Sequence, residues 1–200
     1  MGTAQKGRWG SLTYGSNSPE AKAKLRELVL YIAGQCEGDR TFGAVKLNKI
    51  LFYADFISFA EHGEPVTGVQ YKKYPLGPVP VVLKRERKKM EADGDIVIRK
   101  KTYYGGTQHR VTPIREPDFE KLNARDIALV DHIIKAFANH SGGAMSDLSH
   151  DRAWRNASEG DTIPYEAAFV SDEPLTERDI VISDEMIAEY ERFEQSGARS

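Results

Sequence analysis

Cysteine is almost absent from this 200-residue chain, in which Cys36 is the only one. A single thiol excludes an internal disulfide and any metal site built from several cysteines. No apolar run approaches the ~20 residues that a transmembrane helix needs. Residues 1–17 are polar and rich in Gly, Ser and Thr, without the apolar stretch of a signal peptide. We therefore expect a cytoplasmic protein with a flexible leader over residues 1–18.

The chain also lacks the residue spacings that catalytic and metal sites require. No two histidines stand at His-x-x-x-His spacing, and neither a Gly-x-Ser-x-Gly turn nor a phosphate-binding glycine loop occurs. Cys36 falls on the apolar face of a predicted helix, which favours a buried side chain over a nucleophile. Adjacent helical residues point about 100° apart, so Ser149 and His150 are interpreted as structural. The sequence predicts no enzyme, cofactor or metal, with a small hydrolase using Ser149 and His150 as the weakest alternative.

Net charge is also small, at −2, but the charges are unevenly distributed. Residues 68–115 contain 12 Lys/Arg against 4 Asp/Glu, whereas residues 116–200 contain 8 against 19. Such an asymmetry would steer a charged partner towards one face of the protein. The alternative is that the two segments neutralise each other inside one domain.

The most distinctive segment that is present runs from Phe42 to Glu64. It predicts a helix with apolar residues on nearly every face, which belongs in the middle of a domain. Four polar residues interrupt this apolar helix: Lys46, Asn48, Lys49 and Asp55. Buried polar groups need hydrogen-bond partners, so we expect Asp55 to bond the loop from Tyr71 to Gly77. All four are expected to fasten the helix to the turn at 74–78.

Other helices are predicted from their caps and apolar spacing. Ser18 and Pro19 begin a helix ending near Gly38, and Asn123 begins one running to about Ala138. A basic helix is expected to begin near Val79 or Val81 and end at 93–95, because prolines 75, 78 and 80 disfavour regular structure before it. A short helix is expected near 141–154, a loop over 171–181 and a last helix from Ser183.

Two strands, Ile96–Arg99 and His109–Ile114, are predicted to pair through a turn at Gly105 and Gly106, and residues 64–74 to be extended. The predicted fold class is α+β and mainly α-helical: a compact helical domain with a small antiparallel β-hairpin. One domain is expected over residues 19–195, followed by a disordered tail at 196–200.

Basic residues lie beside aromatic ones in the middle of the chain. Lys84–Lys89 is a basic stretch of predicted helix, and Arg99, Lys100 and Lys101 precede Tyr103 and Tyr104. Basic residues beside aromatics are typical of nucleic-acid binding, so a DNA-binding regulator using residues 84–101 is one alternative. The near-neutral total charge and the acidic second half oppose it. A basic surface offered to an acidic protein fits the same pattern.

Several motifs resemble one known family. They are Lys46-Leu47-Asn48-Lys49, Phe52-Tyr53-Ala-Asp55, then Gly68, Tyr71, Tyr74 and Gly77-Pro78, and later Ser149-His150, Trp154 and Ile163-Pro164-Tyr165. In this order they resemble the SocA-like, or Panacea, antitoxin domain over roughly residues 25–167. The resemblance implies a bacterial, often prophage-associated, non-enzymatic protein that neutralises a toxin by binding it. One member of the family acts as an adaptor that delivers its toxin to a protease. The resemblance therefore also implies a ClpXP-type protease as a possible second partner.

The expected roles of individual residues follow from these patterns. Contacts with the partner toxin are expected from Tyr71, Tyr74, Lys84, Arg85, Arg87, Lys88, Tyr103 and Tyr104. The remaining motif residues are expected to be structural: Lys46, Leu47, Asn48, Lys49, Phe52, Tyr53, Asp55, Gly77, Pro78, Ser149, His150, Trp154, Pro164 and Tyr165. Some family members carry an added DNA-binding domain, for which residues 1–18 are too short and polar. The toxin's identity, the binding face and the oligomeric state are left open.

Overall fold

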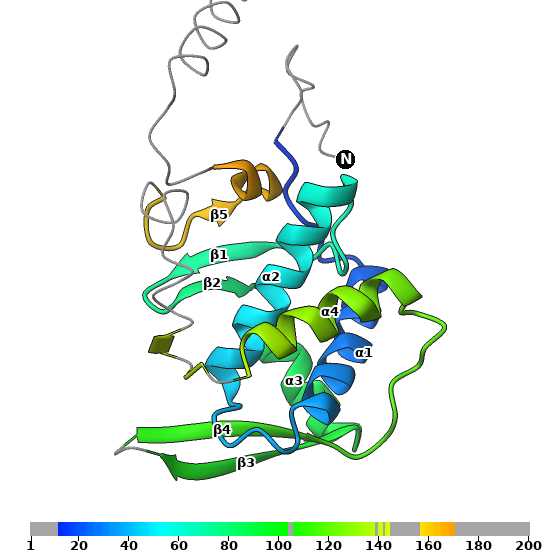
Figure 1. The fold of residues 1–200 in the computed structure, drawn as a ribbon, viewed down its shortest axis with the longest axis vertical. Helices are drawn as coiled ribbons and strands as arrows, with labels where there is room; N and C mark the ends of the chain where they lie inside the picture. Colours follow the sequence, from blue (N-terminus) through cyan, green and yellow to red (C-terminus); the bar gives the residue numbers. More distant parts are fainter. Residues whose placement is uncertain (1–11, 104–105, 139, 142, 145–156, 171–200) are drawn as a thin grey trace, which may run out of the picture. The chain divides into compact units, whose positions relative to one another are not determined.

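Helix α2 (Ala44–His62) lies at the centre of the fold, as its all-round apolarity predicts. The computed structural model describes residues 12–103, 106–138, 140–141, 143–144 and 157–170, which all belong to one unit, 1–170. Figure 1 shows α2 between the β1–β2 hairpin and helix α4. Its buried side chains include Leu47, Ile50 and Leu51. Gly63, with φ +74°, ends the helix in a left-handed conformation that favours glycine.

Two further helices begin at the predicted caps. In α1 (Pro19–Gln35) the Ser18 side chain accepts a hydrogen bond from the backbone N–H of Ala21. In α4 (Ala124–Ala136) Asn123 and Asp126 form a reciprocal capping box. These bonds satisfy backbone N–H groups that a helix start leaves without partners. The predictions for both helix starts are confirmed.

The proline-rich segment departs from the prediction. It forms strand β2 (Gly77–Pro80), paired with β1 (Tyr71–Tyr74), and α3 begins only at Leu83 (Leu83–Ala92). The sheet order is β2-β1-β5, with β5 at Thr162–Ile163, so β2 is an edge strand. The N–H of Val81 points to β1 and donates to Gln70 O at 2.8 Å. Backbone nitrogens alternate in direction along a strand, so those of Pro78 and Pro80 point to the open edge. A missing N–H has no consequence there, which is why prolines fit this strand.

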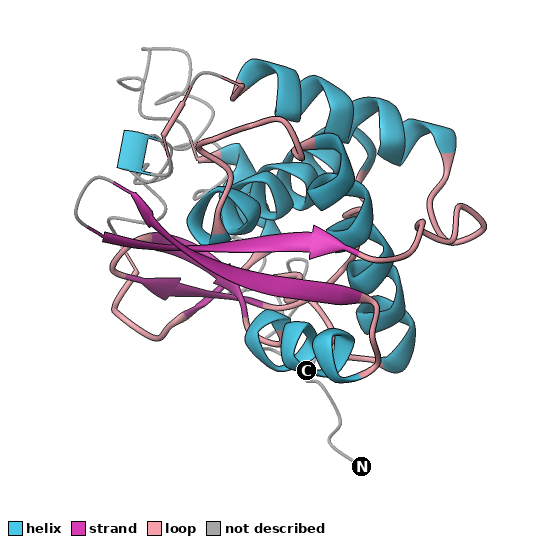
Figure 2. Ribbon diagram, turned by 90° about the horizontal axis from the view of Figure 1, so that it is seen from below, coloured by secondary structure: helices cyan, strands magenta, loops and turns pink. Residues whose placement is uncertain are grey.

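The predicted hairpin is present and longer than expected. Strands β3 (Ile96–Tyr103) and β4 (Gly106–Pro113) pair antiparallel, with Ile98 opposite Val111 and Arg99 opposite Arg110. Figure 2 shows these strands lying across the end of the helices. The α+β class is confirmed, with one more sheet than the sequence predicted.

Residues 12–18 do not form a free leader. Ser16 N–H donates to Gly68 O at 2.7 Å, and Tyr165 N–H donates to Thr13 O at 2.8 Å. A Cβ at Gly15 would lie 2.1 Å from Val69 O, so only glycine allows this close approach. Thr13 contacts the start of a 3-10 helix, η1 (Tyr165–Phe169). This part of the leader prediction is therefore wrong.

Several predictions fall outside the described residues: the helix containing Ser149, His150 and Trp154, the loop at 171–181, the helix from Ser183 and the tail at 196–200. Within the described ranges, no helix has the length and apolarity needed to cross a membrane.

Candidate functional site: buried polar anchors and an exposed basic surface

Asp55 is one of three charged residues buried on α2, with Lys46 and Lys49. Its side chain is 0% exposed and accepts hydrogen bonds from the Thr67 N–H and hydroxyl, both at 2.5 Å, and from the Tyr71 hydroxyl at 2.8 Å. Burial raises the pKa of Asp55 to about 6, although the bonds from Thr67 and Tyr71 act in the opposite direction. Asp55 thus joins α2 to the segment that leads into β1.

An aromatic cluster surrounds this carboxylate. Tyr71 packs against Phe52 and Phe56, with ring centroids 5.8 and 5.4 Å apart, and Tyr165 lies 4.9 Å from Phe56. The Tyr165 hydroxyl donates to Val69 O at 2.6 Å. Burial raises the pKa of both tyrosines, so both hydroxyls are hydrogen-bond donors at neutral pH. Motif residues that are distant in sequence therefore meet in one core cluster.

The structure corrects two expectations at this cluster. Tyr71 is 1% exposed, so it is not available as a surface contact for a partner. The predicted internal bond of Asp55 is present at Tyr71, but its other partner, Thr67, precedes the predicted loop.

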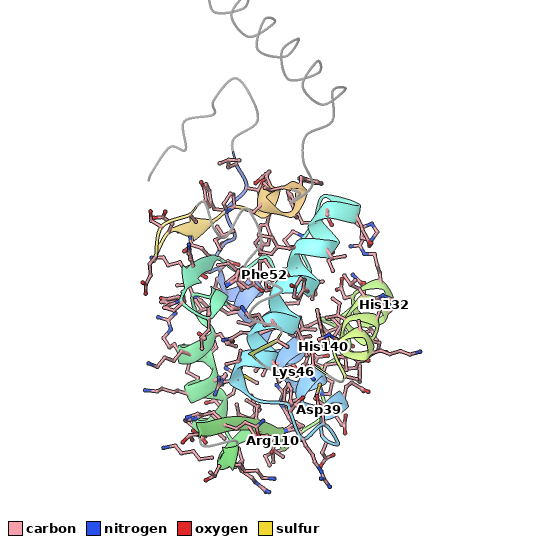
Figure 3. All side chains as sticks on the ribbon, turned by 60° about the vertical axis from the view of Figure 1, so that its left-hand side comes forward. Asp39, Lys46, Phe52, Arg110, His132 and His140 are labelled. Carbon is pink, nitrogen blue, oxygen red and sulfur yellow. The ribbon has the colours of Figure 1, made fainter. Side chains whose placement is uncertain are left out.

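Lys46 is another of the charged residues buried on α2, 1% exposed. Its Nζ donates to Asp39 Oδ2 at 2.6 Å, to Thr41 Oγ1 at 3.0 Å and to His140 O at 3.1 Å. Figure 3 shows Asp39, Lys46 and His140 close together. Burial acts to raise the pKa of Asp39, but the bonds from Lys46 and Thr41 hold it below its ordinary value. The expected link from Lys46 to the turn at 74–78 is wrong: Lys46 joins α2 to the α1–α2 loop and to the segment after α4.

The other motif residues lie in several environments. Leu47, Lys49 and Phe52 are buried on α2, and the Tyr53 ring lies 5.1 Å from Phe137 of α4. Asn48 is half-buried, and its Oδ1 has no hydrogen-bond partner within the described residues. Pro78 is buried in β2, Gly77 has φ +97° at the hairpin turn, and Pro164 precedes η1.

The predicted partner contacts do not form one cluster. Lys84, Arg85 and Lys88 are exposed along α3, whereas Arg87 is half-buried and its burial lowers the pKa of the guanidinium. Tyr74 is 43% exposed at the β1–β2 turn. Tyr103 ends β3 opposite Gly106, and Tyr104 lies outside the described residues, as do Ser149, His150 and Trp154.

Sequence reasoning missed Arg110, which caps α1. Its guanidinium donates to Asp39 O at 2.6 Å and to Cys36 O at 3.0 Å, and also to Glu37 O. A cation at a helix C-terminus satisfies carbonyls that the helix leaves free and complements its dipole. Cys36 is buried there, which raises the pKa of its thiol to about 12, so the thiol is protonated at neutral pH. No signal in the sequence pairs β4 with this loop.

A charge network on the other side of α1 was also missed. Arg115 bonds both carboxylate oxygens of Glu27, at 2.7 and 2.8 Å, and Asp95 at 2.7 Å. Glu27 also accepts from the N–H of Asp118 at 2.8 Å. Burial acts to raise the pKa of Glu27, but these bonds lower it. The loop after β4 is therefore fixed to α1 by a bidentate ion pair.

These arrangements favour a scaffold role for the buried charges. Asp55 and Lys46 are taken up by internal bonds, so neither is open to a substrate. No group of three or more His, Cys, Asp or Glu among the described residues could hold a metal ion. Fold and site together define a small α+β scaffold whose unpaired charges lie on its surface.

The comparisons with known proteins then give the family. Residues 47–155 match the family described as "Antitoxin SocA-like, Panacea domain". This match spans more than half of the chain, so the protein belongs to this family. It includes α2 from Leu47 onward, both hairpins and α4. No curated protein and no solved structure matches the chain.

Proposed function

We propose that this protein is a non-enzymatic antitoxin that neutralises a cognate protein toxin by binding it directly. Membership of the SocA-like antitoxin family is the observation that carries the proposal. The internal use of Asp55 and Lys46 supports it, because binding needs a rigid scaffold with free groups on its surface. The exposed Lys84, Arg85 and Lys88 on α3 would contribute long-range attraction to an acidic toxin.

A growth assay tests this proposal. Expression of the small gene next to the one encoding this protein is expected to arrest growth, and co-expression of this protein is expected to restore it. A Ser149→Ala variant is the matched control, since a hydrolase mechanism requires that hydroxyl whereas binding does not. Failure of the wild type to rescue growth from any neighbouring gene product would contradict the proposal.

Binding could neutralise the toxin in two ways. The complex could block the toxin's active surface, or it could deliver the toxin to a ClpXP-type protease. The half-life of the toxin separates them: delivery shortens it only in cells with the protease, whereas blocking leaves a long-lived complex.

Exposed cations on α3 and β3, among them Lys84, Arg99 and Lys100, favour one alternative, a DNA-binding regulator. Phosphate binding weakens steeply as salt rises, with a slope set by the number of contacts. A gel shift with the upstream DNA at two salt concentrations measures this. We expect no specific shift at physiological salt, and a specific, salt-sensitive shift would favour the regulator.

A further inference from the structure

Two adjoining depressions lie on either side of Glu37, between α1 and β4. One is a groove of about 450 Å³ lined by Leu30, Tyr31, Pro113, Ile114 and Phe119. The other is a basic pocket of about 430 Å³ lined by Arg40, Arg99, Lys101, Gln108 and Arg110. Glu37 lines both, and β4 passes from Thr112 in the pocket to Pro113 in the groove. They form one continuous two-part surface, here called the α1–β4 surface.

The basic pocket carries a net positive charge, because Glu37 is the one acidic residue in a lining that contains Arg40, Arg99, Lys101 and Arg110. Arg40, Arg99 and Lys101 are exposed, and none forms an ion pair with another described residue. Arg110 stands directly opposite Arg99 in the hairpin and is held by the carbonyls at the end of α1. Like charges opposite each other on a sheet are unfavourable, so an anionic group bound there would relieve their repulsion.

The groove combines exposed apolar side chains with polar ones, among them Glu37 and Glu116, and internal contacts hold its shape. Ile114 is 59% exposed and Phe119 is 52% exposed. The Tyr31 ring packs edge-on against Phe119, with centroids 6.1 Å apart, and the Tyr31 hydroxyl donates to Asp131 at 2.6 Å. The Arg115–Glu27 ion pair fixes the loop that carries both exposed side chains. Rigid, exposed aromatic surface costs little entropy to bind, and such side chains are common interface anchors.

The basic pocket and the groove together indicate the chemistry of the partner. A partner needs carboxylates for the pocket and an apolar side chain for the groove. A nucleic-acid strand is disfavoured, because Glu37 and Glu116 line the groove and would repel a phosphate backbone passing through it. An acidic protein segment with one aromatic or aliphatic side chain meets both requirements.

We propose that the α1–β4 surface is the docking site for such a segment of the partner toxin, which rests on the antitoxin function proposed above. The carboxylates bind Arg40, Arg99 and Lys101, and the apolar side chain packs on Phe119 and Ile114. Arg110 acts as a positioning residue that holds the pocket to the end of α1.

The first test is charge reversal, with the purified toxin from the growth assay as the probe. We expect Arg40→Glu/Arg99→Glu to weaken binding about tenfold or more at low salt, mostly through slower association. Both side chains are exposed and Arg99→Glu removes a like-charge pair with Arg110, so the melting temperature should not fall. The matched control is Lys84→Glu/Arg85→Glu, the same change on α3, where we expect a loss of about threefold or less. An equal loss in both variants would overturn the proposal, because net charge alone would then govern binding.

The second test addresses the groove. Truncation of a central aromatic anchor, Phe119→Ala, should weaken toxin binding by about thirtyfold, mainly through faster dissociation. The control is Phe169→Ala, which removes a ring in η1 that is 63% exposed, more than Phe119. The docking site would be overturned if both Arg40→Glu/Arg99→Glu and Phe119→Ala bound the toxin normally. If the wild type still rescued growth, the antitoxin function would remain intact. If Arg40→Glu/Arg99→Glu lost DNA binding but kept toxin binding, the pocket would be a phosphate site. That outcome would also overturn the docking proposal.

Discussion

Replacement of Asp55 by alanine is expected to lower the free energy of unfolding by about 3–5 kcal/mol. The substitution leaves the Thr67 N–H, the Thr67 hydroxyl and the Tyr71 hydroxyl buried without an acceptor. Urea denaturation measures the loss. The control is Glu61→Ala, an exposed carboxylate on the same helix, which should change stability by less than about 0.5 kcal/mol. Similar losses for the two variants would contradict the anchoring role of Asp55.

The pH dependence of stability gives an independent test of the same carboxylate. Its pKa is raised from the ordinary 3.8 to about 6, so the folded state binds this proton more tightly than the unfolded chain. The resulting stabilisation is fully present below about pH 4 and is lost as pH rises through 6. We compare wild type with Asp55→Asn, which cannot ionise, so that the other carboxylates cancel. Between pH 4 and 7 the stability of the wild type relative to this variant should fall by roughly 2–3 kcal/mol. A constant difference would show that Asp55 ionises with an ordinary pKa.

The helices of this fold could be predicted from local signals. Ser18 with Pro19, and Asn123 with Asp126, carry the caps within a few residues of sequence, so helix starts needed no tertiary information. Strand β2 could not be predicted this way, because prolines normally exclude a strand. Only its place at the edge of a sheet, with the backbone nitrogens of Pro78 and Pro80 on the unpaired side, makes the strand possible.

The buried polar residues were identified more reliably than their partners. Asp55 was expected to bond internally because it stands alone in an apolar helix, and it does. Lys46 was assigned to the wrong segment. Helical side chains tilt towards the helix N-terminus, so a lysine in the first turn of α2 reaches the preceding loop at Asp39 rather than a later turn.

The α1–β4 surface could not be predicted because its parts are distant in sequence. Arg40, Arg99 and Phe119 come from a loop, a strand and a second loop. The hairpin register and the Arg115–Glu27 pair bring them together, and both depend on tertiary packing. The sequence did indicate a basic segment over residues 84–101, which includes Arg99 and Lys101, but only the cations of α3 were expected to contact the toxin.

Removal of the Lys46 charge is the second large effect that we expect. Lys46→Met keeps the length and apolar stem of the side chain but leaves the Asp39 carboxylate and the His140 carbonyl without their ammonium partner. Loss of one member of a buried ion pair typically costs about 3–5 kcal/mol. Lys135→Met, an exposed lysine near the end of α4, serves as the control and should change stability by less than about 0.5 kcal/mol. A loss below about 1 kcal/mol for Lys46→Met would contradict the anchoring role.

A double-mutant cycle with Asp39→Asn separates the ion pair from the other bonds of Lys46. Once Lys46 is methionine, an amide at position 39 removes the unpaired charge, so Asp39→Asn should recover about 1–2 kcal/mol in that background and destabilise the wild type. Stability at low pH gives an independent measure of the ion pair. Because the pKa of Asp39 is lowered in the folded state, the wild type loses stability as pH falls through that pKa. Lys46→Met should weaken that pH dependence. If Asp39→Asn has the same effect in both backgrounds, the stabilisation by Lys46 comes from the Thr41 hydroxyl and the His140 carbonyl rather than from the ion pair.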